Sequence, residues 1–314
     1  MKLGIVGTGM VGSAAAYAIA STGVISSLVL IDHDPALASA QAADIADALP
    51  FIGAVSIRAG DYADLEGAGI VVLAAGVAQK PGESRLDLLS RNTVIFADVI
   101  AQVQAIAPDA ILLVATNPVD IMTAVTTKLS GLDPARVIGS GTILDTARFR
   151  VNLGRHLGVS PQSVHAHVLG EHGDSEVLIW SSAECGAMRL EVFASQRGCP
   201  ITESLRADID GAVRHAAQKI ISGKGATWFG IGAALARIVR VIVLDQREIL
   251  TVSSMTKEIA GVQNVCLSLP RILGAGGIEE TLVPAMTQNE TTSLGESARL
   301  LKNATDALWQ VRDA

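Results

Sequence analysis

An apolar run near the start of the chain leads directly into three closely spaced glycines: residues 3–20 read LGIVGTGMVGSAAAYAIA. Gly7, Gly9 and Gly12 form the pattern GxGxxG between a strand-like run and a helix-like run. In this pattern the first glycine permits a tight turn, the second lets the backbone approach a pyrophosphate, and the third allows close packing of helix and strand. A helix N-terminus also offers unpaired N–H groups to phosphates. The stretch therefore predicts a dinucleotide-binding turn.

Asp32 strengthens this interpretation, because it follows the second apolar run and lies twenty residues past Gly12. An acidic side chain at this place can accept hydrogen bonds from both ribose hydroxyls. It also repels a 2′-phosphate, which favours NAD over NADP as the cofactor. The alternative is a turn with structural glycines and a surface aspartate, since the chain holds 30 glycines and such a triplet can arise by chance.

The first 140 residues alternate short apolar runs with amphipathic stretches. Continuous apolar runs are typical of strands buried on both faces of a parallel sheet. Pro35 predicts a helix over residues 36–48, and Asn117-Pro118 predicts a cap and first residue for a helix over 119–129. Alternating strands and helices predict an α/β fold of the Rossmann type with a doubly wound parallel sheet. The expected strands are residues 3–6, 28–31, 70–75 and 111–115.

The second half has longer helical patterns and a different order, which predicts an α+β domain. We place the boundary so that residues 1–141 form the NAD-binding domain and residues 142–314 the catalytic and oligomerisation domain. Expected helices are residues 144–157, 202–222, 228–243 and 292–311, with strands at 163–169, 250–253 and 262–268.

The composition excludes several classes of protein. A net charge of −7 without a basic stripe argues against nucleic-acid binding. No apolar run reaches the roughly 20 residues that a membrane span needs. Three widely spaced cysteines without a CxxC pattern argue against disulfides and zinc, and favour reduced thiols in the cytoplasm. The 49% hydrophobic content then indicates a buried sheet together with apolar subunit interfaces.

Candidate chemical groups occur in two places in the second half. His172 lies between glycines in the segment GEHGDS, directly after an expected strand. Asp145 and Arg148 are three residues apart, so they share one helix face and could point a carboxylate and a guanidinium into one cavity. A solvated histidine and an ordinary surface ion pair are the alternatives.

Six separated motifs in the order GTGMVG, AGVAQKPGESRLDLL, ATNPVD, GSGTILDTARFR, GEHGDSE and GKGAT complete the pattern. Over essentially its whole length the chain resembles the lactate/malate dehydrogenase family, and most of all its bacterial lactate-specific members. The resemblance implies NAD-dependent hydride transfer with His172 as acid/base, oriented by Asp145. It further implies that Arg148 holds the substrate carboxylate and that Arg85, on a mobile loop, polarises the reacting carbonyl.

The same resemblance implies a wider set of contacts. Asn117 and Thr227 match positions of the substrate pocket, and Ile231 matches one near the nicotinamide. The full set expected around NAD is Gly7, Gly9, Met10, Val11, Gly12, Asp32, Gly76, Asn117 and Ile231. The chemistry agrees, because histidine carries a proton near neutrality and a planar guanidinium pairs with a carboxylate through two hydrogen bonds.

Gln79 is the residue from which we predict the substrate. Malate-type members carry an arginine there, which pairs with the second carboxylate of the substrate. Gln79 is neutral and Glu83 adds a negative charge, so a buried dicarboxylate would lack a partner. Lys80 could partly supply one. We therefore expect pyruvate and lactate as substrates, with malate dehydrogenase on the same scaffold as the alternative.

Arg150 and His165 have no evident role in catalysis. In the resembling allosteric enzymes the matching residues of paired subunits bind fructose 1,6-bisphosphate, which implies such an effector here and a homotetramer. His167 shares the strand face of His165. The alternatives are an exposed arginine and histidine without a ligand. A third hypothesis for the whole chain is a nucleotide-binding sensor without catalysis, which the joint presence of His172, Asp145, Arg148 and Arg85 disfavours.

Overall fold

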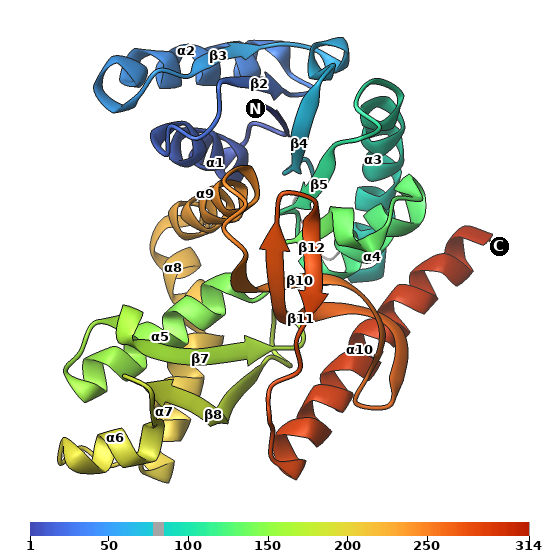
Figure 1. Ribbon diagram of the computed structural model, residues 1–314. Helices are drawn as coiled ribbons and strands as arrows, with labels where there is room; N and C mark the ends of the chain where they lie inside the picture. The colour runs from blue at the N-terminus through green and yellow to red at the C-terminus, as the bar shows by residue number, and fades with distance from the viewer. Residues whose placement is uncertain (78–84, 314) are drawn as a thin grey trace.

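Within residues 1–77 and 85–313, which the computed structural model describes, one long sheet runs through the molecule (Figure 1). Its nine strands follow the order β12-β11-β10-β6-β5-β4-β1-β2-β3. The first six strands of the chain are parallel in the order 3-2-1-4-5-6, which is the doubly wound dinucleotide-binding topology. This confirms the predicted fold. The strands are β1 (Lys2–Val6), β2 (Ser27–Ile31), β3 (Ser56–Ala59), β4 (Ala68–Leu73), β5 (Ile111–Val114), β6 (Val137–Gly139), β10 (Glu248–Ile259), β11 (Val262–Gly274) and β12 (Gly277–Thr281).

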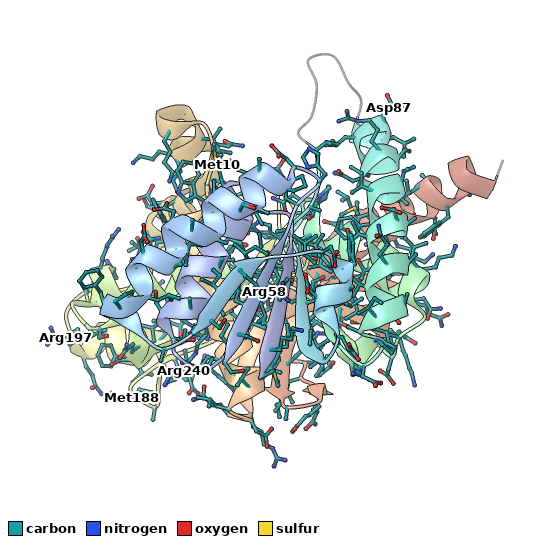
Figure 2. The ribbon with its side chains drawn as sticks, turned by 90° about the horizontal axis from the view of Figure 1, so that it is seen from above. Met10, Arg58, Asp87, Met188, Arg197 and Arg240 are labelled. Atoms are coloured by element: carbon teal, nitrogen blue, oxygen red, sulfur yellow. The ribbon has the colours of Figure 1, made fainter. Side chains whose placement is uncertain are left out.

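Helices cover both faces of this sheet, as the view in Figure 2 shows for the first half. One face packs against α1 (Met10–Ser21), α2 (Pro35–Ile52) and α9 (Phe229–Val243). The other packs against α3 (Arg85–Ile106), α4 (Val119–Ser130) and α10 (Gln288–Asp313).

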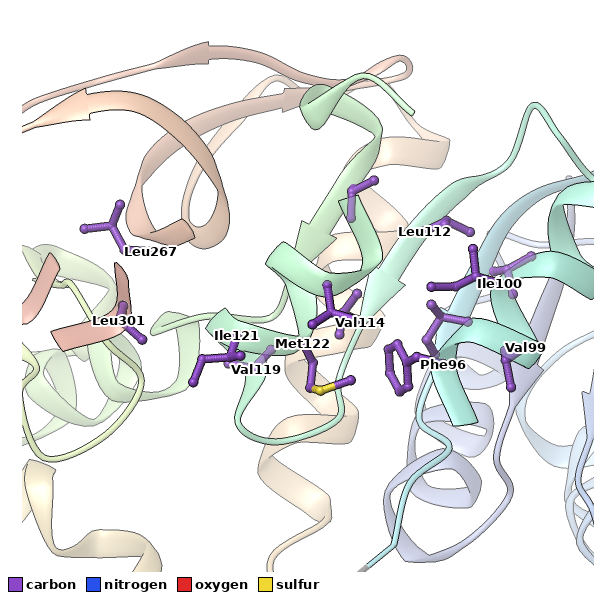
Figure 3. Close-up of a cluster of buried hydrophobic side chains, with 14 of the residues drawn as sticks. Phe96, Val99, Ile100, Leu112, Val114, Val119, Ile121, Met122, Leu267 and Leu301 are labelled. Atoms are coloured by element: carbon purple, nitrogen blue, oxygen red, sulfur yellow. The ribbon is translucent and has the colours of Figure 1, made fainter. Parts of the chain in front are cut away.

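Successive side chains of a strand alternate between these two cores. In β2, Leu28 and Leu30 join the first core, whereas Val29 and Ile31 join the second. Figure 3 shows the second core, where Phe96 and Met122 meet between α3 and α4. Burial on both faces explains why these strands read as unbroken apolar runs.

The two halves of the sequence share this sheet across the predicted boundary at residues 141 and 142. Strand β10 pairs antiparallel with β6 through Ser253 and Gly139. Helix α9 returns to cover the face beside α1, and a Cβ on Gly232 would lie 2.9 Å from the Ala14 backbone. A residue without a side chain is therefore needed where these helices meet.

A smaller sheet and the helices α5 to α8 complete the second half. The sheet consists of β7 (Val164–Leu169), β8 (Val177–Cys185) and β9 (Met188–Arg189), all antiparallel. It packs against α5 (Ile143–Leu157) around Phe149 and Trp180, whose ring centroids are 4.8 Å apart. The remaining helices are α6 (Leu190–Gln196), α7 (Glu203–Arg214) and α8 (Ala216–Lys224) in the same part of the chain, with α9 and α10 already described.

Two local predictions are wrong. The single helix expected over residues 202–222 is broken at His215, whose ψ of 8° ends α7 before α8 begins. The apolar spacing continues through the break, but Val213 is buried whereas Ile220 and Ile221 are exposed. Spacing alone could not show that α8 leaves the core.

The cap of α4 also differs from the prediction. Asn117 does not cap the helix and Pro118 is not its first residue, because Pro118 has the extended angles φ −72° and ψ 115° and takes the cap position itself. The peptide bond between them is cis. The sequence analysis did not predict strands β3, β6, β8, β9 and β12. The strands that it predicted at residues 250–253 and 262–268 are shorter than the observed β10 and β11. In the described part of the chain, no helix has both the length and the apolar character to cross a bilayer.

Candidate active site

A cavity of about 550 Å³ lies where the loop after β5 faces α5, α7 and the turn after β7. It brings together four of the residues expected from the sequence: Asn117, Asp145, Arg148 and His172. Asn117 comes from the first half of the chain and the other three from the second half, where Asp145 and His172 are 27 residues apart in the sequence. The full lining is Leu88, Asn117, Pro118, Asp145, Arg148, His172, Gly173, Asp174, Glu176, Arg214, Ala217 and Gln218.

Asp145 connects the two basic groups of the cavity. It lies in the first turn of α5 and is only 2% exposed. Its Oδ1 accepts a hydrogen bond from Nη1 of Arg148 at 2.8 Å, and its Oδ2 lies 2.5 Å from Nδ1 of His172. The alternative of an ordinary surface ion pair is excluded, because the carboxylate is buried and has two partners.

The electrostatic setting of His172 favours the imidazolium. Burial alone would lower its pKa, but the hydrogen bond and negative charge of Asp145, with the charges of Asp120 and Glu176, raise the pKa to about 9. Since Nδ1 faces Asp145, Nε2 is the ring nitrogen left to exchange a proton with a bound molecule. The imidazole is therefore equipped to carry a proton at neutral pH.

Glu176 is a further titratable group in the cavity lining, and the sequence analysis gave it no role. Burial, the charge of Asp145 and that of Asp210 raise its pKa to about 8, against opposing effects of Arg214 and His172. Its Oε1 has no hydrogen-bond partner among the described residues. The only sequence signal was its place in the motif GEHGDSE, which does not distinguish a buried carboxyl from an exposed one.

Gly170 allows the sharp turn that carries His172. Strand β7 ends at Leu169, and Gly170 has a φ of +87°, a conformation that L side chains rarely adopt. Gly170 and Ser268 exchange two backbone hydrogen bonds of 3.0 Å, so the turn is tied to β11. The chain can therefore leave the small sheet sharply and present His172 to the cavity.

The glycine turn at the N-terminus fits a dinucleotide. A Cβ on Gly12 would lie 1.8 Å from the carbonyl oxygen of Gly7, so the first turn of α1 packs directly on the loop. Gly7 has a φ of +95°. A Cβ on Gly9 would meet no atom within 4 Å, which leaves open space over the backbone at the cap of α1. That space is where a pyrophosphate would approach the helix N-terminus.

Asp32 lies beside this turn and is held as a carboxylate. Its Oδ2 accepts hydrogen bonds from the backbone N–H of Thr8 at 2.6 Å and from the Thr8 hydroxyl at 3.0 Å. Burial would raise its pKa, but the hydrogen bonds from Thr8 and from the N–H of Asp34 hold the pKa below its usual value. The exposed His33 also contacts Oδ1 at 2.7 Å. An ionised Asp32 can accept ribose hydroxyls.

The other expected site residues lie in several environments. Met10 is 60% exposed at the start of α1, and Val11 is partly buried. Gly76 follows β4, where a Cβ would lie 2.8 Å from Cγ2 of Thr116. Ile231 packs on the core from α9, and Thr227 is partly buried just before that helix, outside the residues that line the cavity.

Two expected contacts cannot be placed. Gln79 lies outside the described residues, as do Lys80 and Glu83. Arg85 begins α3, but its side chain is outside the described part of the structure. The sequence analysis assigned no role to Asp120 and Arg214. Asp120 accepts a hydrogen bond from the backbone N–H of His172, and Arg214 donates one to the backbone carbonyl of Glu176. The Arg214–Asp210 spacing of four residues is typical of any surface helix, so it gave no signal.

Arg150, on another side of α5, and His165, on β7, both act electrostatically on His167. Nε of Arg150 donates to the carbonyl oxygen of Ala166 at 2.9 Å, and His165 is exposed. Burial, Arg150 and His165 together lower the pKa of His167 to about 4, so this histidine is neutral at pH 7. Beside it, a groove of about 460 Å³ runs between α5, α9 and β10 and includes Arg150 and Arg237.

Comparison with protein families gives a match along both halves of the chain. Residues 1–139 match the NAD binding domain of lactate/malate dehydrogenase, and residues 142–310 match its alpha/beta C-terminal domain. The chain belongs to the lactate/malate dehydrogenase family. This confirms the family resemblance and identifies NAD as the cofactor, in agreement with the open backbone at Gly9 and the ionised Asp32.

Several members of the lactate/malate dehydrogenase family are similar to this chain over nearly its whole length. An L-lactate dehydrogenase of Allorhizobium ampelinum is 61% identical, covering 96% of this chain and 98% of the relative. One from Thermus aquaticus is 58% identical, covering 98% and 99%. Among solved structures, a lactate dehydrogenase from a Medee basin deep-sea metagenome library has a TM-score of 0.94 and 40% identity, covering 98% of both chains.

Proposed function

We propose that this protein is an L-lactate dehydrogenase that interconverts pyruvate and (S)-lactate, with His172 as the acid/base. The observation that carries the proposal is the Asp145 carboxylate, which holds Arg148 and His172 on one cavity wall. A guanidinium for the substrate carboxylate and a proton carrier for the substrate oxygen are the two groups that 2-keto acid reduction needs from the protein. Relatives named L-lactate dehydrogenase support this choice.

Substrate orientation is the proposed task of Arg148. Its planar guanidinium has five N–H donors, and the pair with Asp145 is made through Nη1. The remaining donors can hold the pyruvate carboxylate through two parallel hydrogen bonds, which also fixes the direction of the keto group. Arg85 would polarise the carbonyl and stabilise negative charge developing on its oxygen.

Proton transfer is the proposed task of His172. NADH, when bound, supplies a hydride to the carbonyl carbon. With its pKa raised to about 9, His172 is protonated at neutral pH and can donate from Nε2 to the substrate oxygen. Asp145 stabilises the imidazolium before donation and keeps the ring oriented afterwards. In lactate oxidation the neutral ring accepts the hydroxyl proton.

Cofactor binding is assigned to the glycine turn and its neighbours. Gly7, Gly9 and Gly12 shape the turn, and the N–H groups at the start of α1 would face the pyrophosphate. Asp32 would accept the ribose hydroxyls once the exposed His33 moves aside. We assign contacts around the rest of the cofactor to Met10, Val11, Gly76, Asn117 and Ile231.

Gln79 is the basis for preferring pyruvate over oxaloacetate. A neutral side chain there leaves a second substrate carboxylate without a partner, and malate dehydrogenase activity is the alternative. The test is the rate of NADH oxidation with pyruvate and with oxaloacetate, compared with the variant Gln79→Arg. We expect a strong wild-type preference for pyruvate and a shift of at least about 100-fold towards oxaloacetate in the variant, since a buried unpaired charge costs several kcal/mol. Equal wild-type turnover of both acids contradicts the proposal.

Fructose 1,6-bisphosphate is the effector that we propose for Arg150 and His165. Two cationic groups that both act on His167 support an anion site, since Arg150 also hydrogen-bonds to the backbone carbonyl of Ala166, next to His165. A ligand shared between paired subunits would favour the catalytically competent assembly.

We further propose that the protein is a homotetramer in the cytoplasm, divided into domains at residues 141 and 142. Exposed apolar residues Phe229 and Ile249 beside the groove at α9 and β10 support subunit contacts. The free thiols Cys185, Cys199 and Cys266 are compatible with a reducing compartment. Analytical ultracentrifugation with and without the bisphosphate tests the assembly.

A further inference from the structure

The carboxylate that we assign to the cofactor ribose already has its acceptor sites filled. Asp32 follows β2, and its side chain is 6% exposed. Oδ2 accepts the backbone N–H of Thr8 at 2.6 Å and the Thr8 hydroxyl at 3.0 Å, and Oδ1 accepts the N–H of Asp34 at 3.1 Å. Nδ1 of His33 lies 2.7 Å from the same Oδ1. Since a carboxylate has about four lone-pair sites, a ribose hydroxyl must displace one of these four contacts.

The contact with His33 is the one that can break most easily. The two backbone N–H groups belong to the glycine turn and to the cap of α2, and the side chain of Thr8 is buried. The side chain of His33, in contrast, is 96% exposed. Its rotation frees a site on Oδ1 without disturbing the turn or the helix. His33 therefore controls access to the acceptor that Asp32 offers.

Two further titratable groups near Asp32 carry no positive charge. Asp34 lies at the cap of α2, where its carboxylate accepts two backbone N–H groups of that helix. Tyr62 belongs to the 3-10 turn Tyr62–Leu65, and burial together with the charges of Asp98 and Asp32 raises its pKa. A 2′-phosphate brought to this corner would therefore meet negative charge.

His33 is the side chain that can supply positive charge here. Arg58, on the neighbouring strand β3, is paired with Asp64 at 2.5 Å (Arg58 is labelled in Figure 2). Within residues 1–77 and 85–313, the ion pair of Asp32 is the one with His33. Histidine is the residue type whose charge ordinarily changes between pH 5 and 8. The charge beside the ribose site can therefore change with pH through one residue.

We propose that His33 is a specificity-determining residue that makes the choice between NAD and NADP depend on pH. A neutral His33 moves aside and leaves the charge of Asp32 to accept ribose hydroxyls and to repel a 2′-phosphate. A protonated His33 offsets that charge and pairs with the 2′-phosphate, so NADP binds more tightly in acid. This role rests on the proposed function, because it concerns the cofactor contact assigned there to Asp32.

The carboxylate itself does not titrate in the range that matters. Burial would raise the pKa of Asp32, but the hydrogen bonds from Thr8 and Asp34 hold it below its usual value. Asp32 is therefore ionised at both pH 5.5 and pH 8.5. A change in cofactor preference between these two pH values must come from His33 or from the phosphate, and substitutions of His33 separate the two sources.

The test measures Kd for NADH and for freshly dissolved NADPH by fluorescence titration at pH 8.5 and pH 5.5. In the wild type we expect the ratio of the NADPH Kd to the NADH Kd to fall by about 30-fold in acid. His33→Gln keeps a polar side chain that cannot be charged. Its ratio should fall only about threefold, because a phosphate monoester itself gains a proton near pH 6. The remaining factor of about ten is the expected effect of one charge-assisted hydrogen bond.

His33→Lys makes the opposite change, since lysine is charged at both pH values. It should bind NADPH at pH 8.5 about tenfold more tightly than the wild type does, and its ratio should fall only about threefold in acid. His215→Gln removes another exposed histidine and is the matched control, which should keep the wild-type response.

An equal pH response in the wild type and His33→Gln overturns the proposal. Wild-type affinity of His33→Lys for NADPH at pH 8.5 overturns it as well. The titrations contain no pyruvate. A wild type that binds NADH without reducing pyruvate therefore contradicts the proposed function and leaves the role of His33 testable.

Discussion

Helix α5 separates two basic regions that place histidine in opposite electrostatic surroundings. On one face, Asp145 contacts both Arg148 and His172, and the pKa of His172 rises to about 9. On another, burial and the charges of Arg150 and His165 lower the pKa of His167 to about 4. A buried carboxylate makes a histidine carry its proton, whereas cationic neighbours and burial remove it. The first region suits proton transfer and the second suits binding of an anion.

We expect the largest effect on activity from replacing His172, the proposed proton carrier of the first region. His172→Asn keeps a side chain that can hydrogen-bond to Asp145 but cannot carry a proton. We expect kcat for pyruvate reduction to fall by about 10²- to 10⁴-fold, the usual contribution of a general acid. NADH binding measured by fluorescence should change little, because the lining of the His172 cavity includes no residue of the glycine turn. Residual activity within a few fold of wild type would contradict the role of His172.

Asp145→Asn removes the charge that distinguishes the two regions. Burial, which lowers the pKa of His172, would then no longer be opposed by the charge of Asp145. The pKa of His172 should fall from about 9 to about 6.5 or below. Since reduction needs the protonated ring, kcat/KM for pyruvate at pH 8 should drop by about two orders of magnitude.

Asp210→Asn is the matched control for this change. It removes another carboxylate near the cavity, one that pairs with Arg214 rather than with the histidine. Its pH profile should stay within about half a pH unit of wild type. Equal shifts in both variants would show that general charge, and not the Asp145 contact, sets the pKa of His172.

Arg150→Gln tests the second region. Basal activity in the absence of effector should stay near wild type, while activation by fructose 1,6-bisphosphate should fall by about tenfold or more, within the range of ordinary allosteric coupling. His167→Gln replaces a histidine that is already neutral and should keep the response. Steady-state kinetics with an effector titration measure both. A wild type that does not respond to saturating bisphosphate contradicts the proposed regulation.

A smaller effect should appear in stability. The folded-state pKa of His172 lies above the ordinary value, so its stabilising contribution is complete below about pH 6.5 and is lost as the pH rises through about 9. With allowance for the partly exposed imidazole, the free energy of unfolding should fall by about 2 kcal/mol across this window. Urea unfolding at fixed protein concentration should show a shallower pH slope in His172→Asn than in wild type. Identical slopes would contradict the linkage.

The sequence predicted the dinucleotide-binding half well, because its signals are local. Apolar runs buried on both faces and the glycine turn each depend on a few adjacent residues. The second half was harder. The pairing of β10 with β6 joins residues more than 100 positions apart, and the break at His215 leaves the apolar spacing intact.

Prediction of the site from the sequence was limited in the same way, because contacts between distant residues were not evident. Residue types and family resemblance pointed to His172, Asp145 and Arg148, but their contact across 27 residues came only with the fold. Asp120 and Glu176 went unnoticed, because burial and not sequence pattern gives them their significance. The predictions for Gln79 and the side chain of Arg85 stay predictions, since both lie outside the described structure.

The pH dependence of kcat/KM for pyruvate reduction by the wild type tests the central claim most directly, because it reports the pKa of the free enzyme's essential acid. A His172 imidazolium held by Asp145 predicts a constant rate through neutral pH and a decline governed by a pKa of about 9. A decline governed by a pKa near the ordinary histidine value of about 6.5 would contradict it.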